Sequence, residues 1–205
     1  MRTATMRALD EAAMAKAIGT IQAEYRAYAA VLNCLDNLVQ DIETHGGTPD
    51  FELLHLILEY ARDFVDRYHR PKEDNYLFKA LRRRAPEALA TLEAFEEEHR
   101  RGRALIAVLD LTLREYQGLG ESAYARVRDA ARQYLDFERS HMRREETEIV
   151  PLARSRLTAE DWQVIDAAFI ENEDPVFGAV PTRRFGKLFS AIVAMAPIPY
   201  GFGVR

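Results

Sequence analysis

Apolar residues recur at alternating steps of four and three over most of this chain, and this spacing is the strongest constraint on its fold. Between about Ile18 and Thr44 the steps continue through Ile21, Tyr25, Tyr28, Leu32, Leu35, Val39 and Ile42. Side chains at this spacing lie along one stripe of an α-helix. Segments with the alternating polarity of a half-buried strand are almost absent. The pattern therefore predicts an all-α protein.

Three further stripes follow the first, and residues that end helices separate them. The second runs from Asp50 to about Arg82, the third contains Leu92 to Tyr116, and the fourth contains Val127 to Leu152. Four helices of about 25 to 35 residues joined by short loops are typical of an antiparallel up-down-up-down four-helix bundle. We therefore assign residues 18–156 to a bundle and residues 1–17 to an N-terminal tail.

The chain beyond the fourth stripe, residues 157–205, is expected to form a C-terminal helical extension that packs on the bundle. Thr158 and Asp161 have the spacing of a capping box, which marks the start of a helix. The expected elements are a short helix over about 158–171, a turn-rich loop over 172–181 and a last helix over about 182–196. The alternative is an apolar surface that binds a partner chain or a membrane.

Composition excludes several classes of function. The 28 Lys and Arg against 33 Asp and Glu give a net charge of −5 that is spread along the chain, so nucleic acid is not an expected partner. The single cysteine, Cys34, excludes an intrachain disulfide framework and fits a reducing compartment. No apolar run reaches the roughly 20 residues that cross a bilayer, and no secretory segment is evident. We expect a cytoplasmic protein without a membrane span, and leave open whether it forms a homodimer.

Polar residues replace apolar ones at several positions of the second, third and fourth stripes. They are three histidines and two glutamates: His69, Glu73, His99, His141 and Glu145. The segments that carry them echo each other, because YHRPKEDNYLF (68–78) aligns with SHMRREETEIV (140–150). A second echo pairs EYR (24–26) with EHR (98–100). Two helical hairpins are thus built alike, each with a His-x-x-x-Glu pair on its second helix.

A His-x-x-x-Glu pair directs an imidazole and a carboxylate toward one point, because residues four apart share one face of a helix. Burying a bare carboxylate costs several kcal/mol unless a cation or a full set of donors compensates. Helical bundles hold di-iron and di-manganese sites with such ligands. The pattern therefore predicts a metal centre, and a purely structural hydrogen-bond network is the alternative.

These motifs resemble those of the hemerythrin-like, or HHE cation-binding, domains. The resemblance covers nearly the whole chain and rests on HRPKEDNYLF, EEEHRRG, SHMRREE and the tail NEDPVFG with RRFGKLFSAIVAMAPIPYGFG. It implies a non-haem di-iron centre with an oxo or hydroxo bridge, and manganese fits the same ligands. The implied metal ligands are His69, Glu73, His99, His141 and Glu145, with Glu73 and Glu145 bridging the two ions.

Tyr25 marks a departure from that family. The family usually has a histidine on the first helix, in an acid-His step similar to Glu98-His99, and this chain has Glu24-Tyr25 there. Members that carry oxygen also tend to have a second histidine on the third helix, where this chain has Arg103. The predicted site therefore has fewer nitrogen ligands than an oxygen carrier.

Two interpretations of Tyr25 stay open. Its phenolate could bind iron as a sixth ligand, which favours the ferric state over reversible O₂ carriage. Alternatively its hydroxyl only donates a hydrogen bond to Glu145, Glu73 or a bound water. Glu24 is a weaker ligand candidate, because it lies about 100° around the helix from Tyr25.

The function expected from this site is binding of, or reaction with, a small oxidant such as O₂, peroxide or NO. Tyr25 favours peroxide or O₂ redox chemistry over O₂ carriage. The alternatives are iron storage, iron donation or repair of iron centres, an O₂ or NO sensor without turnover, and a metal-free helical interaction module. Several charged residues near the motifs are expected to face solvent: Asp74, Glu146, Arg82 to Arg84 and Glu96 to Glu98.

Overall fold

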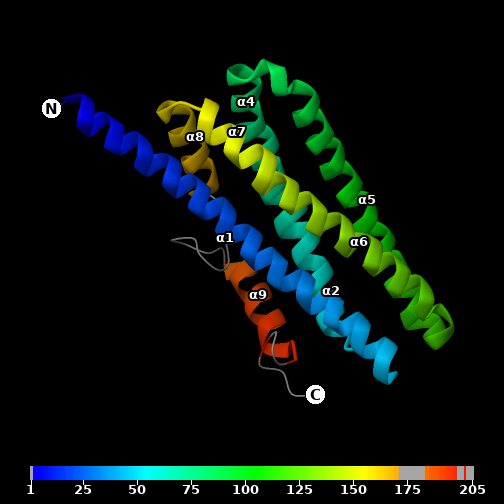
Figure 1. Ribbon diagram of the computed structural model, residues 1–205. Coiled ribbons are helices and arrows are strands. Elements are labelled where there is room, and N and C mark those ends of the chain that lie inside the picture. The colour runs from blue at the N-terminus through cyan, green and yellow to red at the C-terminus, as the bar shows by residue number, and fades with distance from the viewer. Residues whose placement is uncertain (1, 171–182, 198–200, 202–205) are drawn as a thin grey trace.

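Four long helical segments lie side by side and alternate in direction, which confirms the predicted antiparallel bundle (Figure 1). The computed structural model describes residues 2–170, 183–197 and 201, and these contain no β-strand. The first segment is α1 (Arg2–His45) and the third is α5 (Leu89–Leu119). The second consists of α2 (Phe51–Tyr60), η1 (Ala61–His69), α3 (Arg70–Lys72), η2 (Glu73–Phe78) and α4 (Lys79–Arg84). The fourth consists of α6 (Tyr124–Arg144), η5 (Glu145–Ile149) and α7 (Val150–Arg156).

Short connections join these segments. The first contains Gly46 and Gly47, whose φ angles are positive, a backbone conformation that other residues rarely adopt. The second and third connections contain single 3₁₀ turns, η3 (Pro86–Ala88) and η4 (Gly120–Ala123). No helix among the described residues combines the length and apolar character that crossing a membrane requires.

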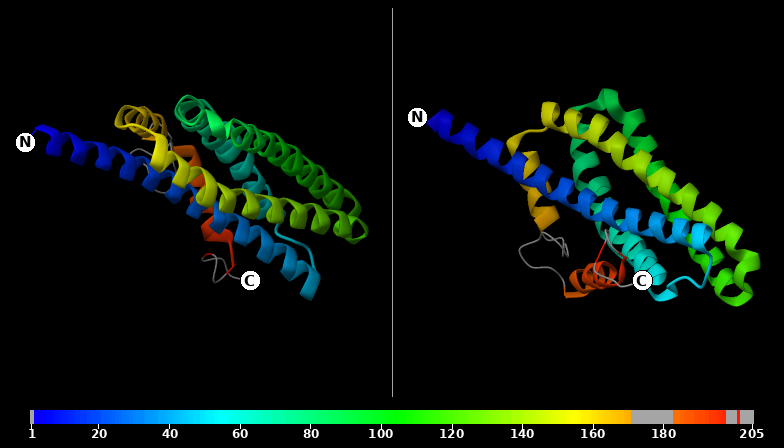
Figure 2. Two further views of the ribbon diagram at one scale, coloured as in Figure 1. Left: turned by 45° about the horizontal axis from the view of Figure 1, so that its top comes forward. Right: turned by 60° about the horizontal axis from the view of Figure 1, so that its bottom comes forward.

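Helix α1 begins at Arg2 instead of near Ile18, so it continues through the residues that the sequence pattern assigns to a tail. Its early part has an apolar partner in helix α8 (Ala159–Ile170), which lies beside it in both views of Figure 2. Ala17, Ile18 and Ile21 share one buried cluster with Trp162, Ile165 and Phe169 of α8. The stripe of α1 alone could not show this partner, which comes from the far end of the chain.

Helix α8 is also attached to the bundle by charged groups. Thr158 and Asp161 form the predicted capping box, with the Thr158 N–H donating to Asp161 Oδ2 at 3.1 Å. Arg84 Nε donates to the same oxygen at 2.7 Å, and Arg83 donates to Oδ1 at 3.0 Å. Both arginines are exposed to solvent, as expected, and pair with Asp161 at the surface. The position of α8 thus depends in part on an ion pair between its Asp161 and an arginine 77 residues earlier in the chain, which local sequence does not reveal.

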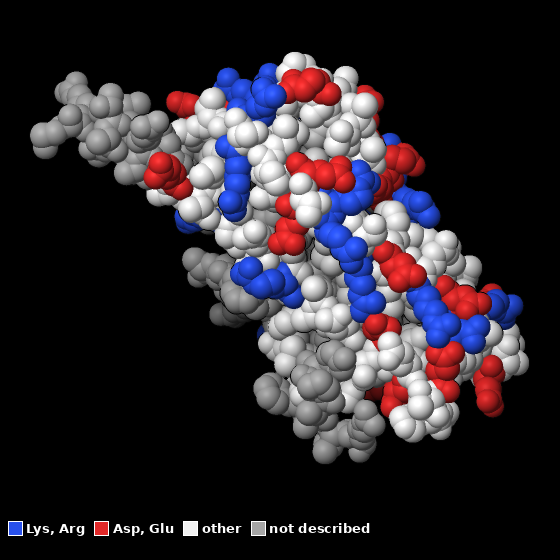
Figure 3. Space-filling model, in the orientation of Figure 1, with Lys and Arg blue, Asp and Glu red and all other residues white. Residues whose placement is uncertain are grey.

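The last described helix, α9 (Arg183–Met195), packs on α2 through Leu188 and Ile192. It agrees with the predicted last helix, whereas the predicted loop over 172–181 and most of the Pro and Gly tail lie outside the described residues. On the face of the molecule in Figure 3, acidic and basic side chains are interspersed. Cys34 is buried in the core, and burial raises the pKa of its thiol to about 11.

Three stretches have π-helical geometry, and each adjoins a predicted metal ligand. His69 ends η1, Glu73 begins η2, and Glu145 begins η5. Pro71 lies between η1 and η2, where its missing N–H removes one helical hydrogen bond. Because η2 and η5 start at equivalent positions of the internal echo, the two hairpins share this distortion. Such π segments are frequent at functional sites, where the extra residue redirects side chains.

Candidate metal centre

The five predicted ligands that are histidine or glutamate meet inside the bundle. His69 Nε2 lies 3.1 Å from Glu73 Oε1, and His141 Nε2 lies 3.4 Å from Glu145 Oε1. His99 Nε2 lies 3.5 Å from both Glu73 Oε2 and Glu145 Oε1. None of the five residues is more than 6% exposed. Three of the four bundle segments thus direct their polar side chains at one interior point.

Three atoms of this cluster lack a hydrogen-bond partner although they are fully buried. They are Glu73 Oε2, His99 Nε2 and Glu145 Oε1. Buried polar atoms in folded proteins nearly always have a partner, because removing them from water without one costs free energy. Here the three face one another with nitrogen and oxygen lone pairs, the donor set that iron, manganese and zinc ions accept. The residues therefore fit a metal, and His99, His141 and Glu145 bring ligand atoms within 4.8 Å of one another.

Each histidine is held by a carboxylate on its outer nitrogen. His69 Nδ1 lies 2.5 Å from Glu24, His99 Nδ1 lies 2.8 Å from Asp74, and His141 Nδ1 lies 2.9 Å from Glu98. A carboxylate accepts a hydrogen bond, so Nδ1 carries a proton and Nε2 is the nitrogen that faces the cluster and is available to a metal. This carboxylate–histidine pairing is the usual outer support of metal-binding histidines.

The outer carboxylates correct three sequence-based expectations. Asp74 and Glu98 were expected to face solvent, which is wrong because they bind His99 and His141. Glu24 was the weaker candidate for a metal ligand, and it instead binds the outer nitrogen of His69. The EYR and EHR echo contained the signal, because Glu24 and Glu98 each precede the central residue and each holds a histidine of the following helix.

The same echo explains the surroundings of Tyr25. Asp74 holds His99, and its echo equivalent is Glu146, whose side chain is exposed as expected. The echo equivalent of His99 is Tyr25, which has no ring nitrogen that Glu146 could hold. Compared with a site in which both hairpins contribute the same residues, this site lacks one histidine and the carboxylate that would hold it. The difference between the two hairpins is confined to the side of the cluster that faces α1.

Tyr25 lies within this gap and contacts the cluster through its hydroxyl. The hydroxyl donates to Glu73 Oε1 at 2.8 Å, and the ring packs edge-on against His69 with centroids 5.4 Å apart. Burial, together with the negative charges of Glu145 and Glu73, raises the pKa of Tyr25 well above 10. Without a metal, Tyr25 is thus a protonated hydrogen-bond donor to Glu73.

The charged groups of the cluster strongly shift one another's pKa values. Burial lowers the pKa of His69 and His99, but neighbouring carboxylates outweigh burial and raise the pKa of His69 well above 6.5 and that of His99 to about 9. Burial raises the pKa of Glu73, but His69 and the other two histidines lower it to about 2. Without a bound cation, protons on the imidazoles balance the carboxylates. A metal would replace them, so metal binding is expected to release protons and to strengthen as pH rises.

A second buried polar layer lies one helical turn away, and sequence reasoning did not identify it. Arg70 is 1% exposed and donates twice to Glu138, with N–O distances of 2.9 and 2.6 Å. Its other terminal nitrogen donates to Asp66 at 2.7 Å. Gly102 gives the guanidinium room, since a Cβ there would lie 2.4 Å from Arg70 Nη1. Gly102 and Glu138 both interrupt the apolar stripes, which was the available signal.

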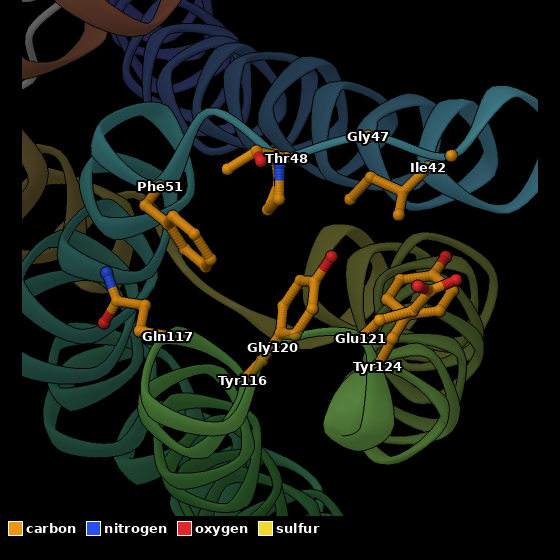
Figure 4. A pocket seen from close by; sticks show the side chains of 11 residues that line it. Ile42, Gly47, Thr48, Phe51, Tyr116, Gln117, Gly120, Glu121 and Tyr124 are labelled. Atoms are coloured by element: carbon orange, nitrogen blue, oxygen red, sulfur yellow. The ribbon is translucent and has the colours of Figure 1, made fainter.

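A surface cavity lies at some distance along the bundle from this cluster. A cavity of about 380 Å³ occurs at the end of the bundle where α1 meets α2 and α5 meets α6, and Phe51, Tyr116 and Tyr124 line it (Figure 4). No residue of the histidine and carboxylate cluster lines this cavity. The cluster is therefore an interior site of the bundle and not the floor of an open pocket.

The outer carboxylates give a first prediction. Replacing Asp74 with alanine should lower metal affinity by about 10- to 100-fold, because His99 loses the partner that fixes its tautomer and orientation. Competition with a chelator of known affinity measures this change. The matched control is Glu146→Ala, which removes the echo-equivalent carboxylate that faces solvent. Equal affinities in the two variants would show that the Asp74 contact plays no part in binding.

Comparison with known proteins agrees with this geometry. The model of the hemerythrin HHE cation binding domain matches residues 16–153, which include every residue of the cluster and its outer carboxylates. No curated protein and no solved structure was found to match the chain. With two thirds of its length matched and a buried His99, His141 and Glu145 group in place, the chain belongs to the hemerythrin HHE cation binding domain family.

Proposed function

We propose that this protein holds two iron ions in the interior cluster and uses them to bind or react with a small oxidant such as O₂, peroxide or NO. The observation that carries the proposal is the convergence of three buried, partnerless donor atoms from Glu73, His99 and Glu145. When bound, the iron pair supplies a centre that can change oxidation state and bind a small ligand. The protein residues determine which coordination positions of the ions are filled and which stay open to a small ligand.

The two halves of the cluster differ in nitrogen content. His99, His141 and Glu145 form one group, which offers two imidazoles and a carboxylate. His69 and Glu73 form the other, which offers one imidazole. Glu73 directs one oxygen toward His69 and the other toward His99, and Glu145 faces both His99 and His141, which supports bridging roles for both carboxylates. A small ligand is therefore expected on the His69 side.

Tyr25 lies on that side with its hydroxyl proton directed at the cluster. In this proposal Tyr25 is not a metal ligand but holds Glu73 and donates a hydrogen bond, or a proton, to the incoming oxidant. Proton donation aids cleavage of an O–O bond more than reversible binding, so Tyr25 favours peroxide or O₂ turnover. The hydrogen bond that its hydroxyl donates to Glu73 supports the donor role over a phenolate ligand.

Tyr25→Phe tests this role directly. The variant should keep its iron and its absorption spectrum, because no iron–phenolate bond is lost. Its rate of peroxide turnover should fall by about 100-fold, the lower range for loss of a positioned proton donor. A broad visible charge-transfer band that is present in the ferric parent and absent from the variant would instead identify Tyr25 as a ligand.

A peroxide assay separates turnover from binding. Hydrogen peroxide is added to the iron-loaded protein, and O₂ release and oxidation of an added electron donor are followed over time. The proposal expects many turnovers per iron pair. A single stoichiometric spectral change without further consumption of peroxide would assign the site to ligand holding or sensing, and no change at all would contradict oxidant chemistry.

A further inference from the structure

Helix α8 lies outside the family match, which ends at residue 153, yet it reaches the metal cluster. Phe169 packs edge-on against His69, with ring centroids 6.1 Å apart and planes at 78°. The Phe169 side chain is 1% exposed, so it is enclosed between α8 and the bundle. A residue of the C-terminal extension is thus part of the immediate surroundings of a predicted ligand.

The three histidines differ in what encloses them. Phe78 stacks on His99, and Phe95 and Phe137 pack on His141. These aromatic rings all come from the matched domain. His69 is enclosed by Tyr25 and Phe64 from the bundle and by Phe169 from the extension. Among the described residues, His69 is thus the histidine of the cluster that a ring from α8 covers.

The attachment of α8 fixes the position of Phe169. Asp161 binds Arg83 and Arg84 near the start of the helix, and Lys16 of α1 binds Asp166 at 2.9 Å. Trp162 and Ile165 lie on the same face as Phe169, at spacings of three and four, and are at most 2% exposed. The apolar face of α8 is therefore fully buried and holds the Phe169 ring against His69.

We propose that Phe169 is a specificity-determining residue that closes the His69 side of the centre to bulky molecules. The proposal rests on the metal centre proposed above, because the His69 side is where a small oxidant is expected to bind. The ring leaves access to H₂O₂, O₂ or NO and excludes organic hydroperoxides and chelators. Because Phe169 lies outside the residues that match the family domain, the C-terminal extension of this chain would set the size of the substrate.

Phe169→Ala in the full-length chain tests the proposal, with Phe189→Ala as the matched control. Phe189 is an aromatic residue of the other C-terminal helix, and it packs on Tyr60 instead of on the cluster. The metal-free proteins are compared first, by hydrogen–deuterium exchange at the histidine ring carbon measured by mass spectrometry. Exchange should become several times faster at His69 in Phe169→Ala, and should stay unchanged at His141 and in the control.

Iron-loaded proteins are compared next. Removal of iron by a bulky chelator should be about tenfold faster in Phe169→Ala, equivalent to about 1.4 kcal/mol off the free energy of opening. The ratio of tert-butyl hydroperoxide to H₂O₂ turnover should rise by a similar factor. The exchange measurement needs no iron. It therefore tests whether Phe169 covers His69 even if the protein proves not to react with small oxidants.

Asp161→Asn provides a second variant in case the smaller side chain at 169 prevents folding. It weakens the arginine attachment of α8 without opening a cavity, and it should accelerate exchange at His69 in the same direction. Unchanged exchange at His69 in a folded Phe169→Ala or Asp161→Asn chain would overturn the proposal. Faster exchange at His69 and His141 alike would also overturn it, since that result indicates general loosening of the bundle.

Discussion

His141→Ala is expected to lower the iron content of the purified chain from about two atoms to one or none. His141 offers Nε2 to the cluster 3.4 Å from Glu145, and its loss leaves two buried carboxylates with fewer partners. A ligand at 1,000 times its Kd stabilises a protein by about 4 kcal/mol. For a chain of this size that corresponds to roughly 10 °C in Tm. Adding iron should therefore raise the Tm of the parent protein but not that of the variant.

Elemental analysis and thermal melts with and without iron check this result. His55→Ala is the matched control, because His55 is a partly exposed histidine of α2 that lies off the interior stripe. The control should keep both its iron and the iron-dependent rise in Tm. Glu145→Ala should behave as His141→Ala does. Full iron content in both of these variants would refute the assignment of the site.

Arg70→Met is expected to destabilise the fold by about 3 to 5 kcal/mol. The change leaves the carboxylate of Glu138 fully buried without the guanidinium that now donates two hydrogen bonds to it. Urea denaturation followed by far-ultraviolet circular dichroism gives the free energy of unfolding. The double variant Arg70→Met, Glu138→Leu should recover much of the loss, because it removes both charges together.

Arg139→Met is the matched control for a surface pair. Arg139 binds Asp36 at 2.8 Å, but both side chains are more than a quarter exposed, so its removal should cost about 1 kcal/mol or less. Gly102→Ala should resemble Arg70→Met, since its Cβ would displace the guanidinium from the position it occupies. If Arg70→Met and Arg139→Met have the same stability, the buried layer does not hold the helices in register.

The stripe spacing was sufficient to predict the bundle because each helix buries one face, and burial imposes the 3.6-residue period on the sequence. The interior histidines and glutamates were predictable for the same reason. Glu73, His99 and Glu145 occupy positions that the period assigns to the core, where charged groups are exceptional. The early start of α1 was not predictable, because its apolar partner Trp162 lies on α8, far along the chain.

The outer carboxylates show where local pattern stops being informative. Asp74 and Glu98 lie beside stripe residues, on the flank of a helix where a charge normally faces solvent. Whether such a side chain reaches a histidine depends on how the neighbouring helix is placed, which is a tertiary property. The contact between Phe169 and His69 is of the same kind, because it joins residues 100 positions apart.

The most direct test of the account is the metal content of the full-length protein after expression with ample iron, measured per folded chain by elemental analysis. Because three buried atoms that can bind a metal have no hydrogen-bond partner in the protein, the account predicts close to two iron atoms per chain. A folded, fully helical chain that binds no metal even after iron loading would contradict it.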